Sequence, residues 1–187
     1  MDQVRPRVKT RERLLDAAEE LLLQYGYEAV SVRGICQQAE ANPAAVHYHF
    51  GSKEQLVAAL LEARLAPVWS GRLDEISSRS LTVEELVEAV CAPIDGLLDD
   101  PVGALRLSLL SRFVLAHPET RWHAPWFGID GWAQALQKAR PELDDAEARR
   151  RCRLAFALLM AQLAPGAPLP PPVAAGLRAF LIAGLST

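Results

Sequence analysis

Cysteine is scarce in this chain of 187 residues, and its three copies lie far apart at Cys36, Cys91 and Cys152. No spacing among them fits a zinc site, and an odd number argues against a disulfide framework. We therefore expect buried thiols in a reducing compartment. The alternative is that one of these thiols serves as a redox sensor.

Long apolar runs are also absent. The densest run, residues 154–164, is too short to span a bilayer. The basic N-terminus is not followed by the apolar segment that a signal peptide requires. These absences predict a cytoplasmic protein that has no membrane partner.

The residue patterns of common catalytic sites are missing as well. The sequence has no Ser-His-Asp spacing, no pair of carboxylates on one apolar face and no phosphate-binding loop. His47 and His49 are two residues apart and would face apart on a helix, which argues against a shared metal ion. We predict that the chain is not an enzyme and has no cofactor.

The charge is small overall but uneven along the chain. A net charge of −3 argues against a protein that binds nucleic acid over its whole surface. Residues 1–13, however, carry five basic and two acidic side chains. A basic segment at one edge of a nearly neutral body suits contact with phosphates at that edge.

Apolar residues recur at helical spacing through most of the sequence, and no segment alternates with the period of a strand. This pattern predicts an all-α fold of about nine helices. We expect a flexible basic arm (1–9), a helix-turn-helix domain (10–55) and a helical domain for ligand binding and dimerisation (56–187). The expected helices cover residues 10–25, 32–39, 43–49, 53–76 with a break or kink at Pro67, 82–98, 101–116, 127–139, 144–163 and 173–185.

Residues 31–53 form the most informative stretch. They predict two short helices joined by a tight turn, with Asn42 as an N-cap before Pro43 at the first helical position. Ser52 and Gln55 are spaced as a capping box for the helix that follows. Helices this short need support from neighbours, and such a pair most often presents its second helix to the DNA major groove.

The segments YGYEAVSVRGICQQA and NPAAVHYHFGSKEQLVAALL make residues 10–62 resemble the TetR family of transcriptional regulators. The spacing from Pro67 to the helix at 144–163 is weakly similar to the fatty-acid-responsive PsrA-type branch of that family. One departure stands out, because Glu40 occupies a turn position where the family usually has glycine. A non-glycine residue at positive φ costs about 1 kcal/mol or more.

The resemblance implies that several side chains contact DNA, with Arg33 and His47 as the polar readers of bases. The small groups at the start of the second helix would touch a thymine methyl, and the remaining polar groups would hold phosphates. The alternatives are a core position for Tyr48, an ion pair of Arg33 with Glu28 or Glu40, and ordinary surface roles for the others. The full predicted set is Ser31, Arg33, Asn42, Pro43, Ala44, Ala45, His47, Tyr48, His49 and Lys53.

The second half implies a ligand pocket and a dimer interface. We expect the pocket to be lined by Trp69, Phe113, Trp122, Trp126, Phe127 and Met160, with Arg112 and His117 as polar groups. The alternative is that these aromatics fill the core. For the interface, a four-helix contact between two subunits, we expect Phe156, Leu159, Leu163, Leu177, Phe180 and Leu181; the alternative is that they close the core of one chain.

Together these features predict a ligand-responsive repressor that binds a near-palindromic operator as a homodimer. Double-stranded DNA and an unknown small hydrophobic effector would be its partners. One alternative is a helical small-molecule-binding protein whose helix-turn-helix is only a scaffold. Another is a protein-interaction module that acts through the Trp-rich segment 117–132.

Overall fold

The computed structural model describes the backbone of residues 4–78 and 80–187 and the side chains of residues 9–69, 76 and 80–187. Within these ranges it contains nine α-helices, one 3₁₀ turn and no strand, so the predicted all-α fold is confirmed. The elements are α1 (Val4–Tyr25), α2 (Val32–Gln38), α3 (Ala44–Phe50), α4 (Lys53–Ser78), α5 (Val83–Leu98), α6 (Pro101–Ala116), η1 (Pro125–Phe127), α7 (Ile129–Ala139), α8 (Asp145–Leu163) and α9 (Pro171–Ser186).

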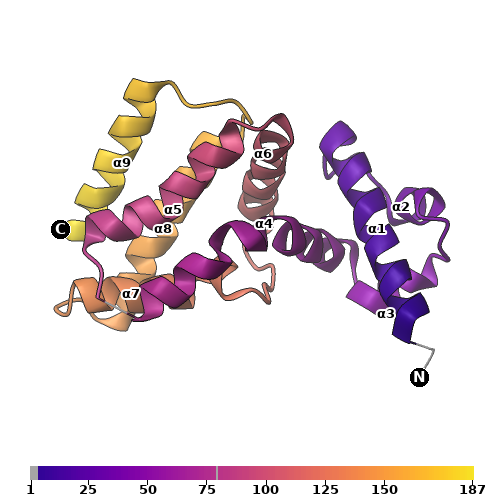
Figure 1. Cartoon of the computed structure of the whole chain (residues 1–187), viewed down its shortest axis with the longest axis horizontal. Helices are drawn as coiled ribbons and strands as arrows, with labels where there is room; N and C mark the ends of the chain where they lie inside the picture. Colours follow the sequence, from indigo (N-terminus) through magenta and orange to yellow (C-terminus); the bar gives the residue numbers. More distant parts are fainter. Residues whose placement is uncertain (1–3, 79) are drawn as a thin grey trace.

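Figure 1 shows α1, α2 and α3 as a separate group at one end of the molecule, with the C-terminus at the opposite end. Helix α4 leaves this group and packs against α5 and α6, so one continuous helix connects both parts. Its 26 residues extend about 39 Å. A movement of the helices around α4 can therefore reach α3.

The apolar core also extends from the N-terminal helices into the C-terminal helices. One cluster runs from Leu14 and Ile35 in the N-terminal group to Phe113 of α6 and Leu163 of α8. A second cluster joins the end of α4 to α5, α7 and α8, and a third holds α9 through Leu181. The two parts of the chain thus share buried contacts and are not connected by α4 alone.

Capping side chains set several helix starts where the sequence places them. The hydroxyl of Thr82 accepts a hydrogen bond from the Glu85 amide, and the Glu85 carboxylate accepts one from the Thr82 amide. Asp100 and Asp144 each accept a hydrogen bond from the amide three residues later. These bonds satisfy donors that a helix N-terminus leaves unpaired, which is why these boundaries were predictable.

Several helices differ from expectation. Helix α7 begins at Ile129 and not at 127, because Pro125–Phe127 form a 3₁₀ turn. Helix α1 begins at Val4, so residues 4–9 are helical and do not form an arm; Pro6 lies in the first turn, where a missing amide costs little. Helix α4 continues through Pro67. Proline has no amide hydrogen to donate to the Ala63 carbonyl, but Ala63 is exposed, so water can satisfy this carbonyl. Helix α9 begins at Pro171, two residues early, since proline is favoured at N1.

None of the helices in the described residues has the length and apolar content needed to cross a membrane.

Candidate nucleic-acid interface

Helix α2 begins at a side-chain cap and packs by one face. The Ser31 hydroxyl accepts a hydrogen bond from the Gly34 amide at 3.0 Å. Ile35 and Cys36 are buried, whereas Arg33 on the opposite side is exposed. Burial raises the pKa of the Cys36 thiol, which fits a packing role. The structure contains no ion pair of Arg33 with Glu28 or Glu40 in its described part.

The turn after α2 has the strained geometry that the sequence suggests. Glu40 has a φ of 48°, the one positive φ among the described residues other than glycine. Backbone hydrogen bonds from Glu40 to Gln37 and from Ala41 to Cys36 close the turn. Arg13 of α1 donates to the Glu40 carbonyl at 3.0 Å and holds the turn against that helix. The strain is therefore compensated by contacts on both sides.

Helix α3 is capped at both ends. The Asn42 side-chain oxygen accepts from the Ala44 amide at 2.9 Å, and Gly51 ends the helix at a φ of 83°. Val46 is buried and anchors the helix to the N-terminal core. Phe50 packs partly against the same core and lies under the Arg11 guanidinium, 5.3 Å from it.

The outer surface of this helix pair is formed by residues predicted to contact DNA. Ser31, Arg33, Asn42, Pro43, Ala44, His47 and Tyr48 are exposed, and Ala45 and His49 are half-buried. The Tyr48 side chain is 61% exposed, so it is not the core aromatic of the alternative interpretation. Its ring contacts His49 edge-on at 5.1 Å.

The imidazole of His47 is held in one orientation. Its Nδ1 lies 2.9 Å from the carbonyl oxygen of Gly51. A carbonyl oxygen can only accept, so Nδ1 must carry the proton. In the neutral ring Nε2 is then an acceptor, and in the protonated ring it is a donor.

Lys53, the first residue of α4, makes a contact within the chain. Its ammonium donates to the Tyr27 carbonyl at 2.5 Å and lies 4.0 Å from the centre of the Tyr27 ring. Burial lowers the pKa of Lys53, and the nearby Glu28 opposes this shift. The cation is therefore engaged within the chain, between the start of α4 and Tyr27 in the turn after α1, and the predicted phosphate contact stays a prediction.

The predicted ligand residues form the boundary between the two parts of the chain. Tyr27 contacts the rings of Phe113 and His117 at 5.3 and 4.7 Å, and Phe113 continues to Trp122. Trp122 stacks on Phe127 at 4.8 Å. The loop that carries these tryptophans is held on α4 by carboxylates: Glu54 accepts from Thr120 at 2.8 Å, and Glu62 accepts from the His123 and Ala124 amides.

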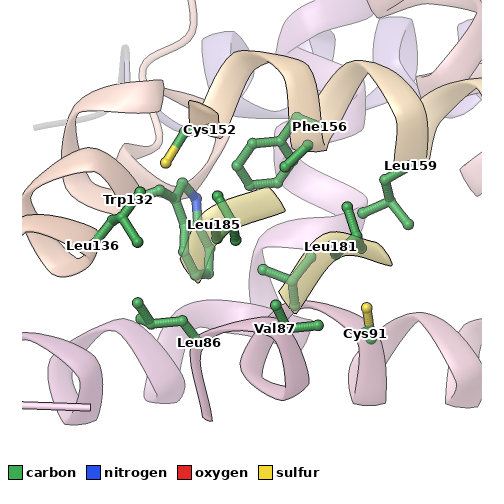
Figure 2. Close-up of a pocket in the computed structure, with 12 residues that line it drawn as sticks. Leu86, Val87, Cys91, Trp132, Leu136, Cys152, Phe156, Leu159, Leu181 and Leu185 are labelled. Atoms are coloured by element: carbon green, nitrogen blue, oxygen red, sulfur yellow. The ribbon is translucent and has the colours of Figure 1, made fainter. Parts of the chain in front are cut away.

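A cavity of about 40 Å³ lies elsewhere in the C-terminal part. Its walls are four residues of α5, two of α7, four of α8 and two of α9, all apolar or thiol-bearing except for the Trp132 indole nitrogen (Figure 2). The residues predicted to bind a ligand do not line this cavity, and their role stays a prediction; they are Trp69, Arg112, Phe113, His117, Trp122, Trp126, Phe127 and Met160. Trp69, Phe113 and Met160 are buried in the main core, and Arg112 donates to the Ala164 carbonyl.

The predicted dimer residues divide into two groups. Leu159, Leu163 and Leu181 are buried within the chain, and Phe156 packs edge-on against Trp132. Leu159, Leu163 and Leu181 are therefore core positions in this chain, and Phe156 is half-buried against the same core. Only Leu177, half-buried, and Phe180, 67% exposed, lie on the open side, beside a groove of about 250 Å³ between α8 and α9.

An ion-pair cluster that the sequence did not reveal connects α1, α4 and α6. The Glu19 carboxylate accepts from Arg64 at 2.7 Å and from Arg106 at 2.6 Å. Arg64 also donates to Asp16 at 2.5 Å. Burial alone would lower the pKa of Arg64, but the hydrogen bond and charge of Glu19 outweigh it, and the pKa is raised. We call these four residues the Glu19 cluster.

The comparisons with known proteins give the same picture of the N-terminal part. The sequence model of the family described as "Bacterial regulatory proteins, tetR family" matches residues 14–60. The transcriptional regulator UidR of Escherichia coli is 36% identical over 52 residues, which are 28% of this chain and 26% of UidR. The transcriptional repressor AcnR of Corynebacterium efficiens is 30% identical over 122 residues, 64% of this chain and 57% of AcnR.

Solved structures extend the likeness to the whole fold. A TetR-family regulator of Streptomyces coelicolor has a TM-score of 0.60 at 21% identity, with 95% of this chain and 98% of that one covered. One from Rhodococcus sp. RHA1 has a TM-score of 0.59 at 16% identity, over 97% and 96% of the two chains. The similarity to the PsrA-type branch stays a prediction.

Proposed function

Since the chain belongs to the TetR family of bacterial regulatory proteins, we propose that it is a repressor that binds a near-palindromic operator as a homodimer and is released by a small apolar ligand. The observation that carries this proposal is the distribution of exposure over residues 31–53. Ile35 and Cys36 of α2 and Val46 of α3 are buried, while Arg33 and His47 of the same two helices are exposed.

The hydrogen-bonding groups and the size of each side chain determine which base edge it can contact. The Arg33 fork matches the two major-groove acceptors of guanine. His47 in its neutral form offers an acceptor at Nε2, so it matches the amino group of adenine or cytosine. Ala44 is exposed at the start of α3 and is small enough for close contact with a thymine methyl. The half-site should therefore contain a guanine and an amino-bearing base within a few base pairs of each other.

The remaining polar groups suit the phosphate backbone. Ser31 and Asn42 use their side-chain oxygens as acceptors in the caps, which leaves the Ser31 O–H and the Asn42 amide N–H₂ as donors. Tyr48 presents a hydroxyl beside His49. Lys53 acts indirectly by holding the start of α4 on Tyr27. We retain the division at residues 55 and 56 between DNA-binding and regulatory parts.

The dimer contact is assigned to the outer face of α8 and α9. Val173 and Phe180 are large apolar side chains exposed beside the groove between α8 and α9. Gly176 and Gly184 are also exposed, and nothing within the chain lies within 4 Å of a side-chain carbon added there. Glycine costs about 1 kcal/mol in a helix, and contacts within one chain do not require it here. Close approach of a second copy of α9 accounts for both observations.

Two recognition helices on a dimer must match half-sites one DNA turn apart, roughly 34–36 Å. A ligand that binds more tightly to a dimer conformation with another helix spacing weakens operator binding. The loss equals the difference in the ligand's binding free energy between the two conformations, typically about 1–3 kcal/mol. The effect would reach α3 through α4, which contacts it directly.

The test is selection of duplexes from a random pool by the full chain, followed by fluorescence anisotropy on the enriched sequence. Arg33→Ala should weaken binding to this sequence by about 1–3 kcal/mol and relax the preference at one position. Arg153→Ala is the matched control, because Arg153 is exposed on α8 far along the chain from the helix pair. Enrichment of no sequence, or equal losses for both variants, would contradict the proposal.

A further inference from the structure

His47 offers a DNA duplex one ring nitrogen in a fixed position. Its Nδ1 donates to the Gly51 carbonyl at 2.9 Å, and the Gly51 amide donates back to the His47 carbonyl at 3.0 Å. Gly51 is the residue that ends α3, so these two bonds tie the ring to the C-terminal end of the helix. Nδ1 donates in the neutral and in the protonated ring, and the orientation is therefore the same in both forms. The residue is exposed, and Nε2 has no hydrogen-bond partner among the residues that the structure describes.

The His47 ring has no ion pair and no charged hydrogen-bond partner in the described part of the chain. Helices α1, α2 and α4 pack on α3, and several of their charged groups are engaged elsewhere. These are Arg11 over the Phe50 ring, Arg13 on the Glu40 carbonyl, Lys53 on the Tyr27 carbonyl and Glu54 with Thr120. The other titratable groups of α2 and α3 themselves are Arg33, Cys36, Tyr48 and His49. Histidine is the side chain whose charge changes between about pH 5 and 8, so the two forms of this ring have to be compared.

The proton on Nε2 decides which base edge this nitrogen can bind. In the neutral ring Nε2 accepts, and the major-groove edge of cytosine presents only an amino donor. In the protonated ring Nε2 donates, and the edge of guanine presents only the acceptors N7 and O6. Each form therefore matches one orientation of a C·G pair and meets a like group in the other. Adenine has a donor and an acceptor on its edge, so it discriminates less between the two forms.

We infer that His47 is a specificity-determining residue whose preferred base reverses with protonation, from cytosine for the neutral ring to guanine for the protonated ring. The inference rests on the proposed function, because α3 must lie in the major groove for Nε2 to reach a base. Phosphates favour a positive charge at the interface, so binding to a guanine-bearing site takes up a proton. Operators that differ only at this base pair would then respond to acidification in opposite directions.

The test begins with selection of duplexes from a random pool by the full chain, at about pH 5.5 and at about pH 8. Selection with His47→Ala identifies the base pair, because the preference should be lost at that position. Fluorescence anisotropy then compares two duplexes that differ only in cytosine or guanine there. The wild type should prefer cytosine about fivefold at the higher pH and guanine about fivefold at the lower pH. The ratio of the two affinities at one pH cancels the sequence-independent attraction of phosphates.

Two matched variants separate this readout from other effects of pH. His47→Gln keeps a hydrogen-bonding side chain but cannot titrate, so its base preference should be the same at both pH values. His49→Gln removes the other histidine of α3 and should leave the reversal intact. NMR of the ring nitrogens in the free protein checks the fixed orientation, because the neutral His47 imidazole should carry its proton on Nδ1.

The inference is overturned by an unchanged preference in the wild type, by a reversal that persists in His47→Gln, or by a proton on Nε2 of the neutral ring. These results leave the proposed function intact, because the chain still binds a selected duplex. A chain that enriches no duplex at either pH would instead contradict the proposed function, and the inference would fall with it.

Discussion

Removal of the Glu19 carboxylate should reveal how firmly α1 is tied to the rest of the molecule. Glu19, Arg64 and Arg106 have side chains that are 16%, 22% and 28% exposed, intermediate between surface and core. A hydrogen bond to a charged group contributes about 1.5–3 kcal/mol, and partial solvation keeps each of the two bonds near the lower limit. Glu19→Ala should therefore lower the free energy of unfolding by about 2–3 kcal/mol.

The assay is urea unfolding followed by circular dichroism, with a double-mutant cycle. Without Glu19, Arg106 loses its carboxylate partner and Arg64 keeps only Asp16, so Arg106→Ala should cost less in the Glu19→Ala background than in the wild type. We expect a coupling energy of about 1–2 kcal/mol. The control is Glu12→Ala on the same helix, because the Glu12–Arg11 pair is exposed and 3.5 Å long; it should cost less than about 0.5 kcal/mol. Additive effects of Glu19→Ala and Arg106→Ala would refute the cluster.

Three further predictions concern the turn, the thiols and the dimer face. Glu40→Gly should raise the free energy of unfolding by about 0.5–1 kcal/mol by relieving the positive φ, measured by urea unfolding, whereas Glu40→Gln should not. Burial raises the pKa of Cys91 and Cys152 from 9.0 to about 11; between these pH values the folded chain keeps protons that the unfolded chain releases. The free energy of unfolding should fall by about 1.4 kcal/mol per pH unit for each thiol, and a Cys91→Ala/Cys152→Ala variant should lose this slope. Phe180→Asp should weaken dimerisation about 100-fold in sedimentation equilibrium, while Val102→Asp, an exposed site on α6, should leave it unchanged.

Local signals in the sequence were sufficient to predict much of the fold. Caps at Thr82, Asp100 and Asp144 act within three residues of themselves, so their helix starts could be read directly. The positive φ at Glu40 was suggested by the family resemblance, which usually has glycine at this position of the turn. The exposed side of α3 followed from burial of Val46 and the helical period.

Long-range partners could not be predicted in this way. Lys53 binds Tyr27, 26 residues away, and Glu19 joins Arg106, 87 residues away; nothing near these residues specifies either partner. Aromatic residues suit a core as well as a ligand pocket, so composition could not place Phe113. Near Leu159, α8 is apolar on every side. Helical periodicity in the sequence therefore could not identify which face contacts a second subunit.

The central claim is that two copies of α3 read one operator together, and hydroxyl-radical footprinting of the selected duplex tests it most directly. The account predicts two protected half-sites whose centres lie about 10–10.5 base pairs apart. Protection should disappear at both half-sites together in Phe180→Asp at protein concentrations where that variant is monomeric. A single protected segment that persists in this variant would contradict the account.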